Sequence, residues 1–330
     1  MTSLVLLAWA TSVALLARPA LTGRWTTSLP RLTIGLWLGA ELSVTVAVLS
    51  AGLFVAVPPA ALAAGLDGIV TACVRALAGM GALHGALAVT ALLATAILVA
   101  RLLVSFVRTF VSARRWRRRH LAALLPLSRQ DADGWTIVDH TEAAVYCLPG
   151  RPGKVVVTSA AFDALTPDEF AAVLRHERAH LRGRHHLLVA LAAAFHRALP
   201  GLPMAETAER EIRRLVEHLA DDRASEHHGR QAVATAIVRL ADRTPRHALG
   251  AATGAVERVR RMLAPPARPR IRHRLVAATA IALLLAGPSA VTVASAGVAL
   301  QGATCPIGSQ PSGGRSVFEK QDEAEWPSTG

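Results

Sequence analysis

The chain has 330 residues, of which 52% are hydrophobic and only 18% charged, and its formal net charge is +13. So apolar a composition excludes an ordinary soluble protein of this length. The positive charge is typical of a nucleic-acid binder or of a membrane protein with basic flanks. The arginines cluster beside long apolar runs, and the single tyrosine, Tyr146, leaves little for base stacking. We therefore expect a mainly α, multi-span helical membrane protein without direct nucleic-acid binding.

Four apolar runs approach the roughly 20 residues that a membrane-spanning helix needs. They cover residues 3–17, 34–57, 86–107 and 275–300. The first run is short, and a signal peptide is the alternative interpretation, but no convincing cleavage site follows it. In the fourth run, Gly287 and Pro288 predict a kink, which a bilayer tolerates.

The arginines that flank these runs predict the topology. They follow the first and third runs and precede the fourth, at positions 18, 24, 31, 108, 114, 115, 117–119, 268, 270, 272 and 274. Cytoplasmic flanks carry the excess of Lys and Arg. We therefore expect a multi-pass plasma-membrane protein with both termini outside and residues 108–274 in the cytoplasm. Residues 301–330 are expected to form a short, disordered extracytoplasmic tail.

Residues 58–81 are apolar but interrupted by glycines and Asp67, which favours a segment along the outer membrane surface. The predicted topology places Cys73 and Cys305 outside, where a disulfide and two free thiols are both open. Cys147 is expected to be a small core residue rather than a nucleophile. No C-x-x-C pair occurs, so zinc held by thiolates is not expected.

Two ionisable residues fall inside the predicted spans. Arg101 lies near the cytoplasmic end of the third span and is expected to reach the interface. Glu41 lies deeper, in the second span. A proton or ion relay is one interpretation. We favour a carboxylate that is paired with another helix or reaches the interface, because the spans hold no further acid.

The soluble region combines strands and helices. Trp135–His140 and Lys154–Ser159 are predicted strands, and Leu148–Gly153 supplies a turn before the second of them. The segment at 154–159 is expected mainly as a sheet member, with edge pairing to an extended peptide substrate as the alternative. Thr166 to Glu169 then predicts a helix start with a capping box and Pro167 in the first turn.

The helix after Thr166 carries H-E-x-x-H as His176, Glu177 and His180. Residues at i and i+4 share a helix face, so both imidazoles can bind one Zn²⁺. Glu177 then stands where a general base can take a proton from the attacking water. The alternative is a pair of surface histidines on an arginine-rich helix. The apolar face formed by Phe170, Val173, Leu174 and Leu181 disfavours that alternative.

A third zinc ligand is predicted on a second helix, residues 205–228. Glu217 would complete an open three-ligand site, and Asp221, one turn further, would accept the free N–H of a zinc-bound imidazole. The alternative pairs these two acids with Arg213 and Arg214 as surface charges.

These motifs carry a family resemblance. An A-x-Y-C-L-P-G segment around Tyr146 comes first in the chain. H-E-R-A-H follows it and continues directly into L-R-G-R-H-H, and E-x-x-A-D comes about forty residues further on. The chain thereby resembles the BlaR/MecR-type membrane zinc metallopeptidases, gluzincins with four membrane spans. The resemblance implies a cytoplasmic α+β zincin domain with zinc on His176, His180 and Glu217, and Glu177 as general base. The penicillin-binding sensor domain of the antibiotic-sensing members is not expected here, because only about thirty polar residues follow the last span and they hold no S-x-x-K motif.

The predicted function is a zinc-dependent endopeptidase that cleaves a cytoplasmic regulatory protein, such as a DNA-binding repressor, in signal transduction. Two alternatives are a quality-control protease of the HtpX type and a non-catalytic receptor or scaffold with a structural zinc site. Candidates for stabilising the oxyanion are Tyr146, His185, His186, His227 and His228. The arginines at 175, 178, 182 and 184 could steer an acidic substrate, although a solvated face near anionic lipid headgroups is the more common role.

Overall fold

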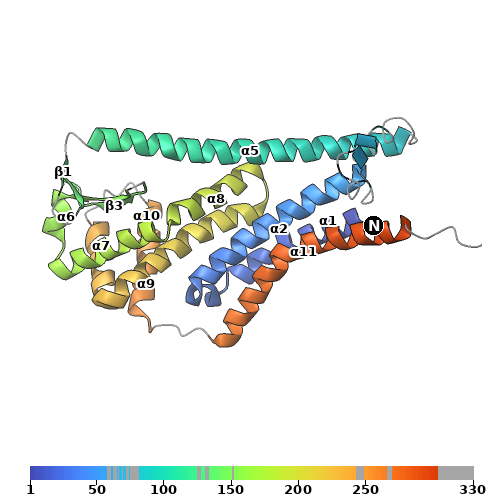
Figure 1. The fold of residues 1–330 in the computed structure, drawn as a ribbon. Helices are drawn as coiled ribbons and strands as arrows, with labels where there is room; N and C mark the ends of the chain where they lie inside the picture. The colour runs from blue at the N-terminus through green and yellow to red at the C-terminus, as the bar shows by residue number, and fades with distance from the viewer. Residues whose placement is uncertain are drawn as a thin grey trace, which may run out of the picture.

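The computed structural model describes residues 1–57, 82–124, 128–130, 134–150, 152–242, 249–265 and 270–303, with a few residues between 58 and 81. The chain is mostly helical in these ranges, and Figure 1 shows two parts. Long helices run together through one part, and shorter helices with a small sheet form the other. Cys73, Cys305, most of the segment at 58–81 and the predicted tail beyond Ala303 lie outside the described residues.

Four helices are long and apolar enough to cross a membrane, as predicted. They are α1 (Thr2–Leu21), α2 (Pro30–Ala56), α5 (Ala82–Leu124) and α11 (Ile271–Ala303). Helices α1, α5 and α11 extend beyond both ends of the apolar runs that predict them, whereas α2 begins before its run and ends at Ala56. Figure 1 shows α11 bending along its length, in agreement with the kink expected at Pro288. The short helix η1 (Arg24–Ser28) joins α1 to α2.

Helix α5 continues well past the predicted span and includes the basic stretch that follows it. Arginine is a good helix former, and no glycine or proline interrupts residues 86–124. Helix α8 (His185–Ala198) packs along α5. Arg101 donates from Nε to the carbonyl of Ala198 at 3.2 Å, and Ser105 donates to that of Ala194 at 2.7 Å. These bonds satisfy carbonyls at the C-terminal end of α8. That Arg101 reaches the membrane interface stays a prediction.

Helix α9 (Pro203–Asp242) joins the two parts of the molecule. Gly229 has φ 79° and ψ 156°, so two helices meet there, one residue after the predicted end of the second helix at 228. The N-terminal half of α9 is buried in one apolar cluster with α1 and α2, which includes Leu6, Trp37, Met204 and Ile212. The part of the molecule that contains the sheet is therefore fixed to the candidate spans through α9.

Glu41 of α2 is fully buried in this region, with 0% relative exposure. Neither of its carboxylate oxygens has a hydrogen-bond partner in the described part of the chain. The described part of the chain therefore contradicts both predictions for Glu41: its carboxylate neither pairs with another helix nor extends to an exposed position. The indole N–H of Trp37, one turn earlier on α2, is also buried without a partner there.

The sheet has four strands in the order β1-β2-β4-β3. They are β1 (Ser128–Gln130), β2 (Thr136–Val138), β3 (Val145–Leu148) and β4 (Lys154–Thr158). Strands β2 and β4 are parallel, and the other two pairs are antiparallel. The predicted strands at 135–140 and 154–159 are confirmed, while β1 was not predicted. Because β4 lies between β2 and β3, the alternative of edge pairing by 154–159 is wrong, and the two edge strands of the described sheet are β1 and β3.

The remaining helices complete the soluble part. They are α6 (Ser159–Ala164), α7 (Pro167–Arg182) and α10 (Leu249–Leu263). Helices α7 and α10 both lie against α9. The gluzincin-like layout of this region and its predicted limits at 108 and 274 stay predictions.

Gly287 of α11 allows a close helix contact. A Cβ atom placed there would lie 2.6–2.7 Å from ring carbons of Trp9 on α1, nearer than real atoms approach. Small residues commonly permit such approaches between membrane helices. Gly287 therefore has a role in contact between α1 and α11 beyond the kink that its neighbour introduces.

We expect Gly287→Ala to destabilise the protein by about 1–3 kcal/mol, because the added methyl group overfills the contact with Trp9. Thermal unfolding in detergent measures this as a lowered Tm. The matched control is Gly254→Ala in α10, where nothing lies within 4 Å of the added Cβ. The control is expected to be neutral or to stabilise by up to about 1 kcal/mol through helix propensity. Equal effects of both substitutions would contradict this account.

Candidate metal centre

Helix α7 carries the H-E-x-x-H motif, and its N-terminus is well capped. The predicted capping box is confirmed: the Thr166 N–H donates to Oε2 of Glu169 at 2.8 Å, and the Glu169 N–H donates to Oγ1 of Thr166 at 3.4 Å. Val173 and Leu174 are buried against the sheet, with Phe170 and Leu181 packed around them, as predicted. This apolar face fixes the rotation of α7 and directs the polar face of the motif towards α9.

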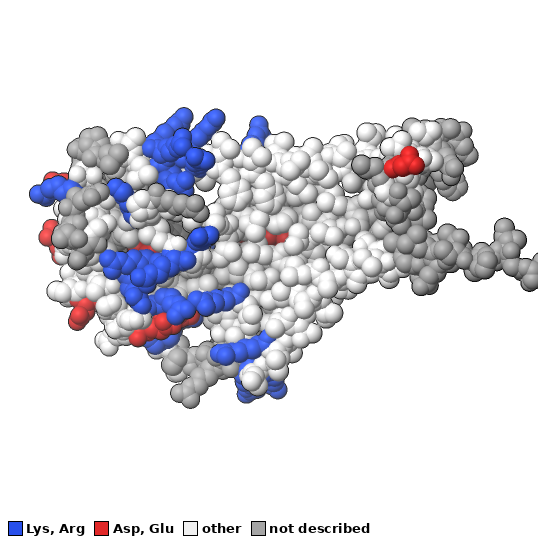
Figure 2. All heavy atoms as spheres, viewed as in Figure 1, with Lys and Arg blue, Asp and Glu red and all other residues white. Residues whose placement is uncertain are grey.

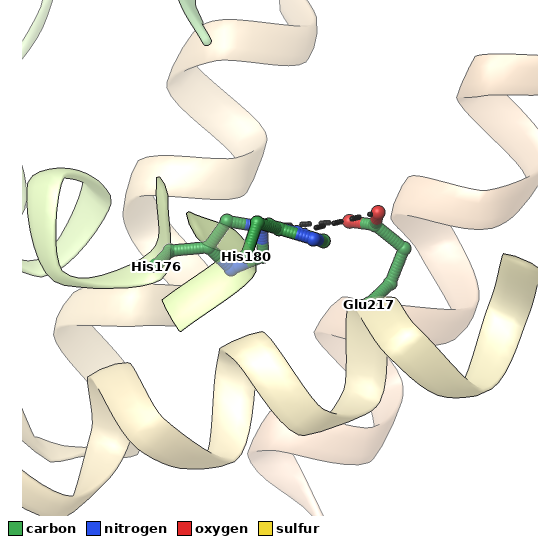
Figure 3. A group of neighbouring side chains, drawn as sticks. All are labelled: His176, His180 and Glu217. Atoms are coloured by element: carbon green, nitrogen blue, oxygen red, sulfur yellow. Dashed lines mark hydrogen bonds and ion pairs between the residues drawn. The ribbon is translucent and has the colours of Figure 1, made fainter. Parts of the chain in front are cut away.

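His176, His180 and Glu217 converge on one point (Figure 3). The two Nε2 atoms lie 3.1 Å apart. Glu217 of α9 places one carboxylate oxygen 3.4 Å from His176 Nε2 and the other 3.5 Å from His180 Nε2. Ligand atoms at about 2.1 Å from a tetrahedral zinc ion lie about 3.4 Å from one another. Two imidazole nitrogens and one carboxylate at these separations therefore fit a zinc ion and leave a fourth position open.

Asp221 lies behind His176. Its Oδ1 is 2.9 Å from Nδ1 of His176, and its side chain is fully buried. Nδ1 is thereby held as the protonated nitrogen, which leaves the lone pair of Nε2 for a metal. Glu217 and Asp221 are one turn apart on α9, so the same helix supplies a candidate ligand and the group that orients another.

A tight turn between α7 and α8 places a third histidine behind His180. Arg184 adopts the left-handed conformation with φ 48°, and His185 then begins α8. The His185 Nδ1 lies 3.0 Å from Nδ1 of His180. A Cβ on Gly183 would lie 2.3 Å from the His185 ring, so only glycine leaves room for this imidazole. His185 therefore orients His180, as Asp221 orients His176.

Arg258 of α10 completes the charge balance, and the sequence patterns did not single it out. Its guanidinium donates to both oxygens of Asp221 at 2.7 and 2.8 Å and lies 3.2 Å from Oε2 of Glu217. One signal does exist in the sequence: Arg258 is one turn before Met262, which is buried, so both share the inward face of α10.

The open side of the cluster is a cavity of about 450 Å³. Glu177 lines it beside the three candidate ligands, and strand β3 forms another wall through Val145, Tyr146 and Cys147. The Cys147 thiol interacts with the Glu177 carboxylate. Cys147 therefore faces the cavity, in contrast to the prediction of a core residue. Burial and the neighbouring Glu177 raise the pKa of the thiol to about 12, which disfavours a nucleophilic thiolate.

The ionisable groups of the cluster shift one another's pKa values. Burial opposes charge on His176, but hydrogen bonds to Asp221 and Glu217 outweigh it and raise its pKa to about 9. Burial and the neighbouring His176 lower the pKa of His180 to about 4. Burial raises the pKa of Glu177. A metal would have to displace the proton of His176, since only neutral imidazole binds metal.

The lining of the cavity distinguishes between the residues proposed to stabilise the oxyanion. Of the five proposed oxyanion stabilisers, Tyr146 lines it and His185 lies behind His180, while His186, His227 and His228 are absent from its walls. The Tyr146 hydroxyl lies 2.9 Å from Nε2 of His120. The surface alternative for Glu217 and Asp221 is wrong, because Arg213 pairs with Glu209, and Arg214 with Glu211 and Glu257.

Two histidines on one helix, a half-buried glutamate beside the first of them and a second glutamate on another helix form a metallopeptidase-like arrangement. Residues 112–241 match the sequence profile of Peptidase family M48. The matched region contains all five predicted site residues and supports assignment to a zinc metallopeptidase family. The finer resemblance to BlaR/MecR-type enzymes is not confirmed by this match. No curated protein and no solved structure matches the chain.

We expect Asp221→Asn to weaken zinc binding by about 10–100-fold, because the amide cannot accept the His176 N–H as strongly as a carboxylate does. Competition with a chromogenic chelator measures the affinity. The matched control is Asp222→Asn on the same helix, which removes a carboxylate that pairs with Arg261 instead. Unchanged zinc affinity in Asp221→Asn, or an equal loss in both variants, would contradict the orienting role.

Proposed function

We propose that this protein is a membrane-embedded, zinc-dependent endopeptidase. One observation carries the proposal: Glu177 lines the same cavity as a ligand triad spaced for tetrahedral zinc. A purely structural zinc site is closed and needs no neighbouring base. The match to Peptidase family M48 supports the same conclusion.

The residues of the chain divide the chemistry between them. His176, His180 and Glu217 would hold zinc, which supplies Lewis acidity for the water and for the scissile carbonyl. Glu177 takes the proton of the attacking water and delivers it to the leaving amine. Burial raises the pKa of Glu177, which brings the carboxylate closer to the basicity that both transfers require. Asp221 holds the orientation of the His176 imidazole, and His185 holds that of the His180 imidazole.

Strand β3 is the proposed site of peptide binding. Among the described strands it lies at an edge and pairs with β4 alone, and three of its residues line the cavity. An extended peptide that pairs with such an edge lays its backbone along the cavity in a fixed register. Tyr146, at the middle of β3, packs beside Leu121 and Leu124 of α5, and its hydroxyl lies 2.9 Å from Nε2 of His120, so its contacts do not favour it over the other oxyanion candidates.

The proposed location is the plasma membrane, with the catalytic region in the cytoplasm. Figure 2 supports this: Lys and Arg gather over the half of the molecule that holds α7, α9 and α10, and the half formed by the bundled long helices shows almost none. An excess of Lys and Arg marks cytoplasmic flanks.

The proposed substrate is a cytoplasmic regulatory protein, such as a DNA-binding repressor, cleaved in a signalling pathway. This part rests on the resemblance of the motifs. New protein N-termini in cells with the wild type and with a Glu177→Gln variant would identify substrates. Cleavage of one or a few regulators supports signalling, whereas many misfolded membrane proteins would support the quality-control alternative.

We expect Glu177→Gln to lower peptide hydrolysis by about 10²–10⁴-fold, because the amide cannot accept the proton of the attacking water. Casein or self-cleavage measures activity in the purified protein, and metal analysis measures zinc. The variant is expected to retain zinc, since Glu177 is not one of the three converging groups.

The matched control is Glu206→Gln at the exposed start of α9, which is expected to keep full activity. Full activity in Glu177→Gln as well would overturn the catalytic assignment. Zinc retained without any hydrolysis by the wild type would favour the receptor or scaffold alternative.

A further inference from the structure

A second cavity, of about 290 Å³, lies on the other side of the metal centre. It is formed where the start of α2 meets the end of α7 and the middle of α9. Its walls are Arg31, Arg175, Ala179, Arg182, Gly183, His185, Leu219 and Arg223. We refer to it as the arginine pocket. Four guanidinium groups line it, and its walls hold no carboxylate.

The positive charge of the arginine pocket is poorly compensated. Arg31 and Arg182 have no ion pair within the described ranges. Arg175 contacts the ring of His227 at 2.8 Å, which supplies no negative charge. Only Arg223 pairs with an acid, Glu226, at 2.9 Å on the exposed surface. Arg31, Arg182 and Arg223 are exposed, so an anion in the pocket would meet their guanidinium groups, and it would break no ion pair of Arg31 or Arg182.

An adjoining cavity does contain acids, but they are engaged. It shares Arg31, Leu219 and Arg223 with the arginine pocket and adds Asp222, Glu226 and Arg274 among others. Asp222 accepts two hydrogen bonds from Arg261 at 2.8 Å each. The acids therefore do not neutralise Arg31 or Arg182.

The position of the pocket points to a phosphate ligand. Arg31 is the second residue of α2, a candidate span, so the pocket lies at the end of the apolar bundle, where headgroups would be. The long helix α2 also begins there without a side-chain cap, so its free N–H groups add positive potential. The planar guanidinium fork matches phosphate oxygens in pairs, which suits arginine better than lysine for this ligand.

We propose that the arginine pocket binds a phosphoryl group, that of an anionic phospholipid headgroup or of free phosphate. A general attraction of surface arginines to an anionic membrane is the competing account. That account requires no pocket and predicts that any two interfacial arginines contribute equally. The inference does not rest on the proposed peptidase activity.

The experiment compares the full-length protein with two double variants that remove equal charge. Arg31→Gln/Arg182→Gln removes the two uncompensated arginines of the pocket. Arg270→Gln/Arg272→Gln removes two exposed arginines at the start of α11 that line neither cavity. Each protein is unfolded thermally in neutral detergent with added short-chain phosphatidylglycerol, with short-chain phosphatidylcholine, or with inorganic phosphate at matched ionic strength. Zinc binding in each variant confirms that it has folded.

At a ligand concentration about one hundred times Kd, the wild type is expected to gain roughly 5–10 °C in Tm. The α11 control is expected to keep this gain and the pocket variant to lose it. A gain with phosphatidylglycerol alone identifies a lipid headgroup as the source, and a gain with inorganic phosphate identifies free phosphate. No gain with either, or equal gains in both variants, would overturn the proposal.

Discussion

The burial of α9 in the apolar core of the spans is the constraint on which the rest of the structure depends. Met204 and Ile212 pack beside Leu6 and Trp37, and little more than a turn later the same helix supplies Glu217 and Asp221. Because both carboxylates lie on the same helix as these packed residues, the packing of α9 against α1 and α2 fixes where the carboxylates lie. Since metal-ligand geometry tolerates only about 0.5 Å of error, packing among the candidate spans helps to determine the geometry of the candidate metal centre.

The second constraint is the placing of acids beside one another. Glu177, Glu217 and the fully buried Asp221 all lie around one cavity, and a buried carboxylate among others of the same charge needs compensation. Arg258 contacts two of these carboxylates, and His176 contacts the same two. Helix α10 is therefore needed for the electrostatics of the centre, although it lies beyond the region that matches the peptidase profile.

The sequence predicts best what depends on neighbours along the chain. The capping box at Thr166 and the shared face of His176 and His180 follow from helical periodicity alone, and the long apolar runs predict the four candidate spans. Features that depend on distant partners were missed. Strand order made β3 the edge in place of β4, and the approach of α10 brought Arg258 to Asp221. The spacing of Arg258 from Met262 indicates that both lie on one face of a helix, but the local pattern at 145–148 or at 258 does not identify the partners on other elements.

The net charge of +13 can now be divided by location. Arginines on α9 and α10, such as Arg213, Arg214 and Arg261, are paired with acids and cancel within the soluble part. The excess lies on the basic half of α5, where α2 and α11 begin, and on α7, whose Arg175 and Arg182 have no acid partner in the described ranges. The cavity beside Glu177 is lined by a single guanidinium, that of Arg258, which is engaged by two acids. The excess positive charge is therefore concentrated away from the candidate catalytic cavity, and the chemistry of that cavity is set by its carboxylates and imidazoles.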